Sequence, residues 1–327
     1  MSDKSPGRAT AIAPANIALI KYWGKKDAKL RLPTNDSISM NLSAVTTVTA
    51  VEFVDGLKED LVSIDRRSVS GVEKQRIIAH LDRIRRMAGT HLKARVESRN
   101  NFPKGTGLAS SASGFAALTL AASRSAGLAL SEKELSILAR LGSGSACRSI
   151  PSGFVEWRAG NSDKNSFAHS LFPGDYWDIR DVIAIIGRDA KKVSSTEGHA
   201  AVESSPFFKE RLRGLPQKIR RIKEAIRKKD FSEFGEITES EAINMHAVMM
   251  TSNPALIYWM PATLRVMNQI IDWRASGLES YFTIDAGPNV HVLCRAKDAM
   301  KLERRLSMVE GVENVIVNQP ANGAILI

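Results

Sequence analysis

The sequence predicts an α+β fold in two domains, and three observations lead to that prediction. The chain has 327 residues, a length that fits two ordinary domains. Its content of 43% hydrophobic and 25% charged residues is typical of a globular protein with a full core. Segments with strand-like and helix-like patterns interleave in both halves, which is compatible with α/β or α+β architecture. We place the boundary near residue 180, giving domains 1–180 and 181–327.

Strands in the first half are predicted from β-branched and apolar runs that end in turn residues. They are ATAIAPANIALIKYW, AVTTVTAVEFV, LKARVESRNNFP and GFVEWRAG, beginning at Ala9, Ala44, Leu92 and Gly153. Helices are predicted from apolar residues at helical spacing. They are RIIAHLDRIRRMAG from Arg76, the alanine-rich segment that ends at Ser123, and SEKELSILARLGSG from Ser131.

The second half continues the same alternation. IRDVIAIIGR from Ile179 is typical of a buried strand, and a long helical stretch is expected from about Ser205 to Met250. Another helix is predicted for PATLRVMNQIIDWRASG, followed by strands YFTIDAG and HVLCRA. A last helix, DAMKLERRLSMVEG, and a last strand, NVIVNQ, follow them.

The net charge of +11 is compatible with a nucleic-acid surface, an acidic membrane or small polyanionic substrates. The two densest basic stretches begin at Arg76 and Lys209, and both have apolar residues at helical spacing. We interpret them as amphipathic helices with a solvated cationic face. Neither contains interleaved aromatic residues for base stacking, so the prediction is no nucleic-acid partner.

Neither a membrane segment nor a disulfide framework is predicted. No run of about 18 apolar residues occurs, and MSDKSPGRAT at the start lacks the apolar segment of a signal peptide. We therefore expect a cytoplasmic protein without a membrane partner. Cys147 and Cys294 lie far apart without metal-ligand spacing, so reduced thiols are expected.

A glycine and serine segment, PKGTGLASSASGFAALTLAAS, opens directly into a predicted helix. Gly105 and Gly107 allow positive φ and close approach of a ligand, and Ser110 and Ser111 add hydroxyl donors at the helix start. The segment is neither a Walker A loop nor a GxGxxG fingerprint. It predicts a phosphate-binding loop, although the same pattern is also found in capped surface helices.

Two further clusters combine cations with polar groups. APANIALIKYWGKKD places Lys21 and Lys25 near Tyr22 and Asn16, whose amide can fix a lysine or a substrate hydroxyl. GSGSACRSIPSG places serines beside Arg148, a combination suited to bidentate capture of a carboxylate or phosphate. The alternative interpretation of the first cluster is core aromatic residues with solvated lysines. The alternative for the second cluster is a polar turn.

A third segment, TIDAGPNVHV, places Asp285 at the end of a predicted strand. Scaffolds commonly expose reactive groups at such positions. An aspartate before a Gly-Pro turn is also a common turn residue, so the pattern alone leaves both interpretations open.

Taken together, these segments closely resemble the mevalonate diphosphate decarboxylase family of the GHMP kinase superfamily. IKYWGK, GLASSASG, GSGSACRS and DAGPN carry the resemblance, together with LPTNDSISMNLS, VSSTEGH and NMHAVMMTSNP. They occur in the family's order over nearly the whole chain, and IPSGF after Arg148 is the one departure. The resemblance implies a GHMP kinase fold. Its N-terminal domain is ribosomal-S5-domain-2-like, its C-terminal domain is a ferredoxin-like α/β sandwich, and the active-site cleft lies between them.

The resemblance also implies an activity. Family members convert mevalonate 5-diphosphate and ATP to isopentenyl diphosphate, ADP, phosphate and CO2, a step of isoprenoid biosynthesis, with Mg²⁺ on the nucleotide. The residues implied for ATP binding are Gly107, Leu108, Ala109, Ser110, Ser111 and Ser113. The catalytic residues implied are Asp285, Arg148 and Lys21. The substrate-binding residues implied are Tyr22, Lys25, Ser143, Ser145, Arg148 and Ser195.

Roles follow for the main groups. Asp285 is expected to accept or orient the proton of the C3 hydroxyl as the γ-phosphoryl group arrives, and Arg148 to hold the substrate carboxylate. No side-chain motif for a metal occurs; Mg²⁺ is carried by ATP, with Ser111 as a candidate ligand. The resemblance to the family also implies a homodimer.

Alternative activities stay open at this stage. Relatives use mevalonate 5-phosphate, or phosphorylate the C3 hydroxyl of mevalonate without decarboxylation, and Asp285 favours the decarboxylase over the mevalonate 3-kinase. A nucleic-acid-binding protein on the S5-like fold is the alternative from another class. It predicts RNA binding that weakens steeply with salt and no ATP turnover.

Overall fold

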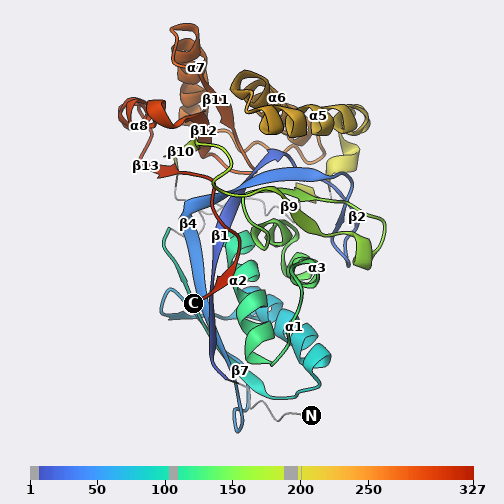
Figure 1. Ribbon diagram of the computed structural model, residues 1–327. Coiled ribbons are helices and arrows are strands. Elements are labelled where there is room, and N and C mark those ends of the chain that lie inside the picture. The colour runs from blue at the N-terminus through green and yellow to red at the C-terminus, as the bar shows by residue number, and fades with distance from the viewer. Residues whose placement is uncertain (1–6, 103–109, 188–197, 200) are drawn as a thin grey trace.

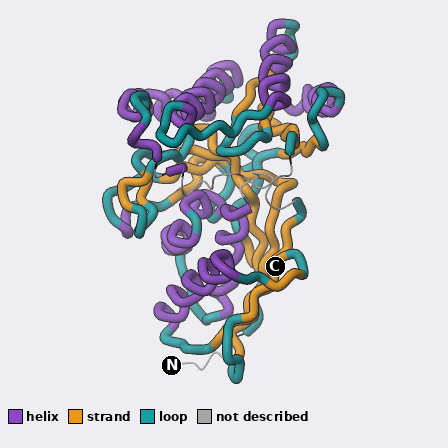
Figure 2. Tube along the Cα trace, turned by 180° about the vertical axis from the view of Figure 1, so that it is seen from behind, coloured by secondary structure: helices purple, strands orange, loops and turns teal. Residues whose placement is uncertain are grey.

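Two antiparallel-rich sheets with helices packed on them make up the protein (Figure 1). The computed structural model describes residues 7–102, 110–187, 198, 199 and 201–327. Seen from behind, the strands form a continuous central layer, and the helices gather at the top and along one side (Figure 2). The predicted α+β class agrees with this arrangement.

The larger sheet has eight strands and carries most of the first half of the chain. They are β1 (Ala9–Ile20), β4 (Ser37–Val54), β5 (Leu61–Ile64), β6 (Arg67–Ser68), β7 (Lys93–Asn100), β8 (Phe154–Trp157), β9 (Ala168–Phe172) and β14 (Ile325–Leu326). The order is β14-β1-β4-β7-β5-β6, with β8 pairing β4 and β9. A separate hairpin, β2 (Lys25–Asp27) and β3 (Leu32–Pro33), follows β1.

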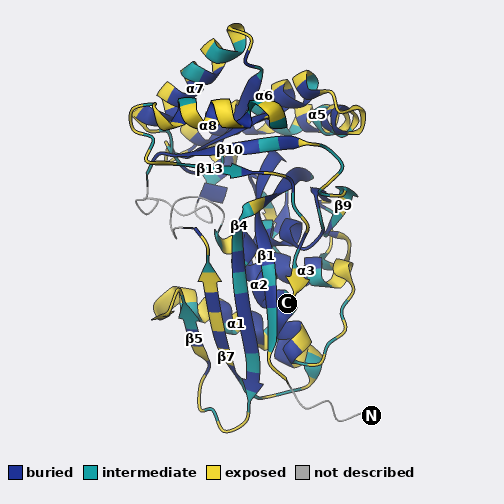
Figure 3. Ribbon diagram, turned by 60° about the vertical axis from the view of Figure 1, so that its left-hand side comes forward, coloured by how far each residue is buried: buried dark blue, intermediate teal, exposed yellow. Residues whose placement is uncertain are grey.

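Helices α1 (Gly71–Ala88), α2 (Ser110–Ser125) and α3 (Glu132–Gly142) cover one face of this sheet (Figure 3). The 3-10 helices η1 (Gly144–Ser149) and η2 (Asp163–Asn165) follow α3. α2 packs on β1 and β4 through small residues, among them Ala112, Ala116 and Ala121, which are fully buried. Side chains this small let a helix approach a sheet closely, so the start of α2 is held firmly beside β4.

The second sheet has four strands, all antiparallel to their neighbours, in the order β11-β12-β10-β13. They are β10 (Ile179–Ile185), β11 (Ser280–Thr283), β12 (Val290–Arg295) and β13 (Asn314–Asn318). The helices of this part are η3 (Val202–Ser204), α5 (Phe208–Lys228), α6 (Phe231–Met250), α7 (Pro261–Ala275), η4 (Ala296–Asp298) and α8 (Ala299–Ser307). Figure 1 shows the longer ones above the sheet.

The long helical stretch expected up to Met250 is two helices. α5 ends at Lys228, and its C-cap residue Lys229 has a left-handed φ of 57°. α6 begins after Asp230, whose side chain accepts a hydrogen bond from the Glu233 amide. Helical spacing continues across the break, so periodicity did not reveal it. The aspartate N-cap is the local signal that marks the second helix.

One hydrophobic core joins the two sheets. It contains Ile17 and Leu19 of β1, Ile183 of β10, Ile222 of α5 and Phe234 of α6, all buried. In Figure 3 the buried residues run without interruption from β1 to β10. Because β1 is buried along its second half, the residues directly after it are held in a fixed place. β14 returns the end of the chain to β1, so the domain boundary near residue 180 stays a prediction.

Candidate active site

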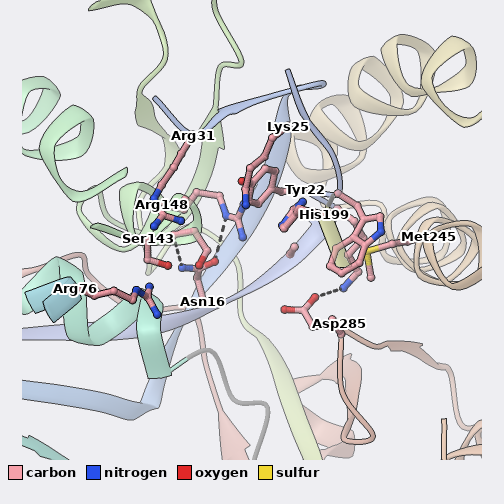
Figure 4. Close-up of a pocket in the computed structure, with 16 residues that line it drawn as sticks. Asn16, Tyr22, Lys25, Arg31, Arg76, Ser143, Arg148, His199, Met245 and Asp285 are labelled. Carbon is pink, nitrogen blue, oxygen red and sulfur yellow. Dashed lines mark hydrogen bonds and ion pairs between the residues drawn. The ribbon is translucent and has the colours of Figure 1, made fainter. Parts of the chain in front are cut away.

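A pocket lies where the end of β1, the start of η1 and the turn after β11 meet (Figure 4). It is lined by Asn16, Ala18, Lys21, Tyr22, Trp23, Lys25, Arg31, Arg76, Ser143, Gly144, Ser145, Arg148, His199, Met245, Asp285 and Ala286. Most of these residues belong to the first half of the chain, whereas His199, Met245, Asp285 and Ala286 belong to the second. Both halves of the chain therefore contribute to this pocket.

Lys21 and Asp285 form an ion pair, with 2.7 Å between Nζ and Oδ1. The lysine is 1% exposed, and the aspartate side chain is 29% exposed and borders the pocket. Burial acts to raise the pKa of Asp285, but the charge and hydrogen bond of Lys21 outweigh it and hold that pKa below its ordinary value. Burial also lowers the pKa of Lys21, against the opposing effect of Asp285. The aspartate is therefore an ionised acceptor at neutral pH.

Arg148 faces the pocket from η1 and is held by neutral groups. Its Nε donates to Asn16 Oδ1 at 3.2 Å, and its Nη1 donates to Ser37 Oγ at 2.9 Å. The Asn16 amide donates in turn to Ser149 Oγ at 2.8 Å. Among the described residues no carboxylate forms a salt bridge with this guanidinium, which is almost fully buried. A buried cation without an anionic partner favours binding of an anionic ligand.

Positive charge dominates the pocket. Its described lining includes five cations, Lys21, Lys25, Arg31, Arg76 and Arg148, against the single carboxylate of Asp285. Burial, followed by the charges of Arg31 and Arg76, lowers the pKa of Lys25 to about 8. Charges of one sign gathered in this way raise the local concentration of anions.

Aromatic rings form one wall of the pocket. His199 stacks on Tyr22 and Trp23, with ring centroids 4.3 and 4.6 Å apart. The backbone amide of Gly24 donates to His199 Nδ1 at 2.8 Å, and burial holds the histidine pKa well below its ordinary value. The imidazole is therefore neutral and carries its proton on Nε2.

A second pocket adjoins the first at the start of α2. It is lined by Thr49, Val62, Ile64, Glu73, Arg76, Ile77, Val96, Ser98, Asn100, Ser110, Ser111, Gly114, Phe115 and Leu118. Six of the lining side chains are apolar, and Ser110 and Ser111 add two hydroxyls at the helix start. An apolar chamber that ends in a helix N-terminus suits a planar base with attached phosphates.

The two pockets meet at two contacts. Arg76 lines both of them. Ser111 Oγ and Ser143 Oγ share a hydrogen bond of 3.2 Å across the junction. The pocket that contains Lys21, Asp285 and Arg148 therefore adjoins the second pocket.

The structure gathers most of the predicted site residues. The members of the first pocket are Lys21, Tyr22, Lys25, Ser143, Ser145, Arg148 and Asp285, and those of the second are Ser110 and Ser111. Gly107, Leu108, Ala109 and Ser195 lie outside the described residues. Ser113 is fully buried and shares a hydrogen bond of 2.7 Å with Thr47 Oγ1 of β4. Its hydroxyl is bonded to β4 and it lines neither pocket, so its role in ATP binding stays a prediction.

The lining residues that the sequence prediction did not assign to the site include Trp23, Arg31, Arg76 and His199. Arg76 belongs to a stretch interpreted as a solvated cationic face, and the structure instead brings it to the junction of the pockets. Arg31 directly precedes the LPTNDSISMNLS segment and belongs to no motif that the sequence analysis used. Within the described part of the chain, no cluster of three or more His, Cys, Asp or Glu side chains is arranged to hold a metal.

The comparisons identify the family. The model for the diphosphomevalonate decarboxylase-like N-terminal domain matches residues 13–168, and the model for the mevalonate 5-diphosphate decarboxylase C-terminal domain matches residues 181–320. The chain belongs to the diphosphomevalonate decarboxylase family. A curated family member, from Aspergillus fumigatus, is 37% identical over 322 residues, which covers 91% of this chain and 79% of the relative.

Solved structures of family members have the same fold. The enzyme from Staphylococcus aureus superposes with a TM-score of 0.93 at 38% identity, with 98% of each chain covered. The enzyme from Enterococcus faecalis gives a TM-score of 0.91 at 38% identity, also with 98% of each chain covered. One related structure, at 39% identity and a TM-score of 0.93 over 98% of each chain, is described as a complex with MVAPP, AMPPCP and magnesium. The predicted family and GHMP kinase fold are thereby confirmed.

No helix in the described part of the chain combines the length and apolar character needed to cross a bilayer.

Proposed function

We propose that the protein decarboxylates mevalonate 5-diphosphate with ATP, yielding isopentenyl diphosphate, ADP, phosphate and CO2. The observation that carries the proposal is the Lys21–Asp285 ion pair, which lines the same pocket as the buried guanidinium of Arg148. Among the described residues, no carboxylate forms a salt bridge with that guanidinium. This arrangement places an acceptor for a hydroxyl proton beside a site for a carboxylate. Both groups occur in one substrate, a 3-hydroxy acid.

The second pocket fits ATP. Apolar side chains such as Val62 and Phe115 offer contact to the base, and Ser110 and Ser111 lie at the α2 N-terminus, where a helix favours phosphate. We propose that the predicted loop residues Gly107, Leu108 and Ala109 complete this cradle. Mg²⁺, when bound with the nucleotide, supplies charge neutralisation at the phosphates. Ser111 is the candidate side chain to contact it.

In the proposed reaction Asp285 acts on the C3 hydroxyl. The carboxylate accepts or orients the hydroxyl proton while the oxygen attacks the γ-phosphorus of ATP, and ADP leaves. Lys21 holds Asp285 in place through the 2.7 Å hydrogen bond. Its charge also lies near the oxygens of the arriving phosphoryl group, where it stabilises negative charge.

Arg148 then fixes the substrate carboxylate. As phosphate leaves C3 with the electrons of the C–O bond, the electron pair of the bond between the carboxylate and C2 forms the C2=C3 double bond, and CO2 is released. Tyr22, Ser143 and Ser145 are proposed to surround the substrate, and Lys25 to contact its phosphates. Ser195, outside the described residues, is proposed as a further substrate contact.

The decisive experiment measures ADP and CO2 separately with mevalonate, its 5-phosphate and its 5-diphosphate. We expect equal amounts of ADP and CO2, with the 5-diphosphate as the best substrate. In Asp285→Asn we expect kcat to fall by at least about 100-fold, the usual order for a lost general base, while substrate affinity changes little.

Two outcomes would contradict the proposal. ADP release without CO2 would identify a mevalonate 3-kinase, and preference for the 5-phosphate would identify a phosphomevalonate decarboxylase. Asp272→Asn, a change in α7 outside the lining of either pocket, is the matched control and should keep full activity. Loss of turnover in that control would show that the assay reports stability instead of chemistry.

We further propose a cytoplasmic homodimer. α7 exposes Leu264 and Ile271, which are seven residues apart and so share one face of the helix. An exposed apolar face of this kind supports self-association. Light scattering on the purified protein distinguishes a dimer from a monomer.

A further inference from the structure

Arg31 has an unusual backbone and an unusual place. It lies in the hairpin between β2 and β3 with a φ of 52°, a left-handed conformation that side-chain-bearing residues rarely adopt. Such a conformation costs of the order of 1 kcal/mol and persists where the surroundings impose it. In this chain the conformation directs a half-buried arginine into the lining of the first pocket.

One hydrogen bond holds the Arg31 side chain, and its other guanidinium nitrogens have no partner among the described residues. Its Nε donates to the carbonyl oxygen of Leu141, at the end of α3, at 3.2 Å. No carboxylate among the described residues forms a salt bridge with it, and no further hydrogen bond from its guanidinium is found there. Figure 4 shows the side chain reaching down from its loop on the Arg148 and Ser143 side of the pocket.

The five cations of the pocket form two groups according to the side chains that hold them. Lys21 is paired with Asp285, and Arg148 is held by Asn16 and Ser37 deep in the pocket. The other three, Lys25, Arg31 and Arg76, are close enough for Arg31 and Arg76 to act on the Lys25 pKa. A terminal phosphoryl group carries close to two negative charges at neutral pH, which suits such a group of cations.

Arg31 and Arg76 differ in one respect that separates the two ligands. Arg76 lines both pockets, so it has access to the phosphates of ATP as well as to the acidic substrate. Arg31 lines the first pocket alone. Its free guanidinium nitrogens therefore face the space assigned to the acidic substrate.

We propose that Arg31 contacts the terminal phosphoryl group of the acidic substrate and sets the preference for a diphosphate over a monophosphate. The inference rests on the proposed function, because it identifies the first pocket as the substrate site. A guanidinium offers two parallel donors to phosphate, so lysine at this position retains the charge but loses the paired geometry.

The kinetic test compares Arg31→Gln and Arg31→Lys with Arg158→Gln. Arg158 is exposed and lines neither pocket, so it controls for loss of one positive charge. In Arg31→Gln we expect KM for mevalonate 5-diphosphate to rise about 10- to 100-fold, the range for one hydrogen bond to a charged group. KM for ATP should change less than about twofold. In Arg31→Lys, KM for mevalonate 5-diphosphate should lie between the values of wild type and Arg31→Gln.

Specificity gives the sharper readout. The ratio of kcat/KM for the 5-diphosphate to that for the 5-phosphate should fall at least about fivefold in Arg31→Gln and stay unchanged in Arg158→Gln. An equal loss with both substrates would overturn the proposal, because it would show only a long-range charge effect. A rise in KM for ATP equal to that for the substrate would overturn it as well.

A binding experiment separates this inference from the proposed function. Mevalonate 5-diphosphate is titrated calorimetrically into wild type and Arg31→Gln without ATP, after circular dichroism has shown that both are folded. Absence of turnover in wild type would contradict the proposed function. Equal dissociation constants for the two proteins would contradict the role of Arg31, whether or not turnover is seen.

Discussion

At the scale of single residues, the pocket depends on charged side chains that are buried and held by fixed partners. Lys21 and Asp285 neutralise each other across 2.7 Å, and Arg148 is stabilised by amide and hydroxyl groups. Lys25 has no such partner among the described residues, and its pKa of about 8 reflects burial and two neighbouring arginines. Its charge therefore changes close to neutral pH.

This pKa predicts an alkaline limb in the pH profile. Lys25 must be protonated to attract phosphate, so kcat/KM for the substrate should fall as the pH rises through about 8 in the free enzyme. In Arg31→Gln one repelling charge is removed, which raises the Lys25 pKa and moves the limb to higher pH. Initial rates from pH 6.5 to 10 check this, and Arg158→Gln should keep the wild-type midpoint. A midpoint that stays or moves down in Arg31→Gln would exclude the coupling.

At the scale of elements, α5 and α6 fix the end of β1. Arg211 of α5 donates to the carbonyl oxygen of Lys21 at 3.1 Å and to Glu241 of α6 at 2.5 Å. Both of these side chains are fully buried. The ion pair thus ties the backbone of a proposed catalytic residue to the helices of the other half of the chain.

Breaking this pair should cost both stability and activity. Glu241→Gln leaves Arg211 buried without its anion, and we expect the free energy of unfolding to fall by about 3–5 kcal/mol, measured by urea denaturation. Glu236→Gln, an exposed change on the same helix, is the control and should have no effect.

A double variant distinguishes stability from positioning. Arg211→Met with Glu241→Leu replaces the ion pair by apolar contact, which commonly restores stability. The Lys21 carbonyl nevertheless loses the Arg211 donor and keeps only the amide of Asn35, so kcat should stay below that of wild type. Full activity in a restored double variant would show that Arg211 does not position Lys21.

The sequence predicts much of the fold and site because both lie in local patterns. β1 follows from a β-branched and apolar run, and α3 and α7 follow from helical spacing; the structure adds a Ser131–Glu134 capping box at the start of α3. The resemblance marks Lys21, Arg148 and Asp285, and the structure places them together. Arg31 and Arg76 remained unpredicted because their role depends on tertiary contacts: one on a hairpin anchored to Leu141, the other on a helix turned toward the junction of the pockets.

At the scale of the whole molecule, the end of the chain closes the structure around the site. β14 pairs with β1, and the Ala324 amide donates to the carbonyl oxygens of Ser149 and Ile150 at 3.0 and 3.2 Å. These residues directly follow Arg148. The chain therefore leaves the first sheet, forms the second, and returns to support the segment that holds the proposed carboxylate site.

The variant Gly323→Ala tests whether the returning chain end supports the segment that follows Arg148. A Cβ added there would lie 2.1 Å from the carbonyl oxygen of Ile150 and 2.6 Å from the backbone of Pro151, and backbone atoms cannot rotate away as a side chain can. Gly323→Ala should therefore displace either the chain end or the segment after η1. We expect a loss of about 1–3 kcal/mol in unfolding free energy, the usual range for overpacking, and a higher KM for the acidic substrate because Arg148 moves with that segment.

The matched control is Gly214→Ala. Gly214 lies within α5, and an added Cβ would meet nothing within 4 Å, so alanine should keep or slightly raise stability through its better helix propensity. Thermal unfolding and substrate KM measured on both variants decide the matter. Wild-type values in Gly323→Ala would mean that the returning chain end does not constrain Arg148. A loss of stability with unchanged KM would limit its role to holding the two sheets together.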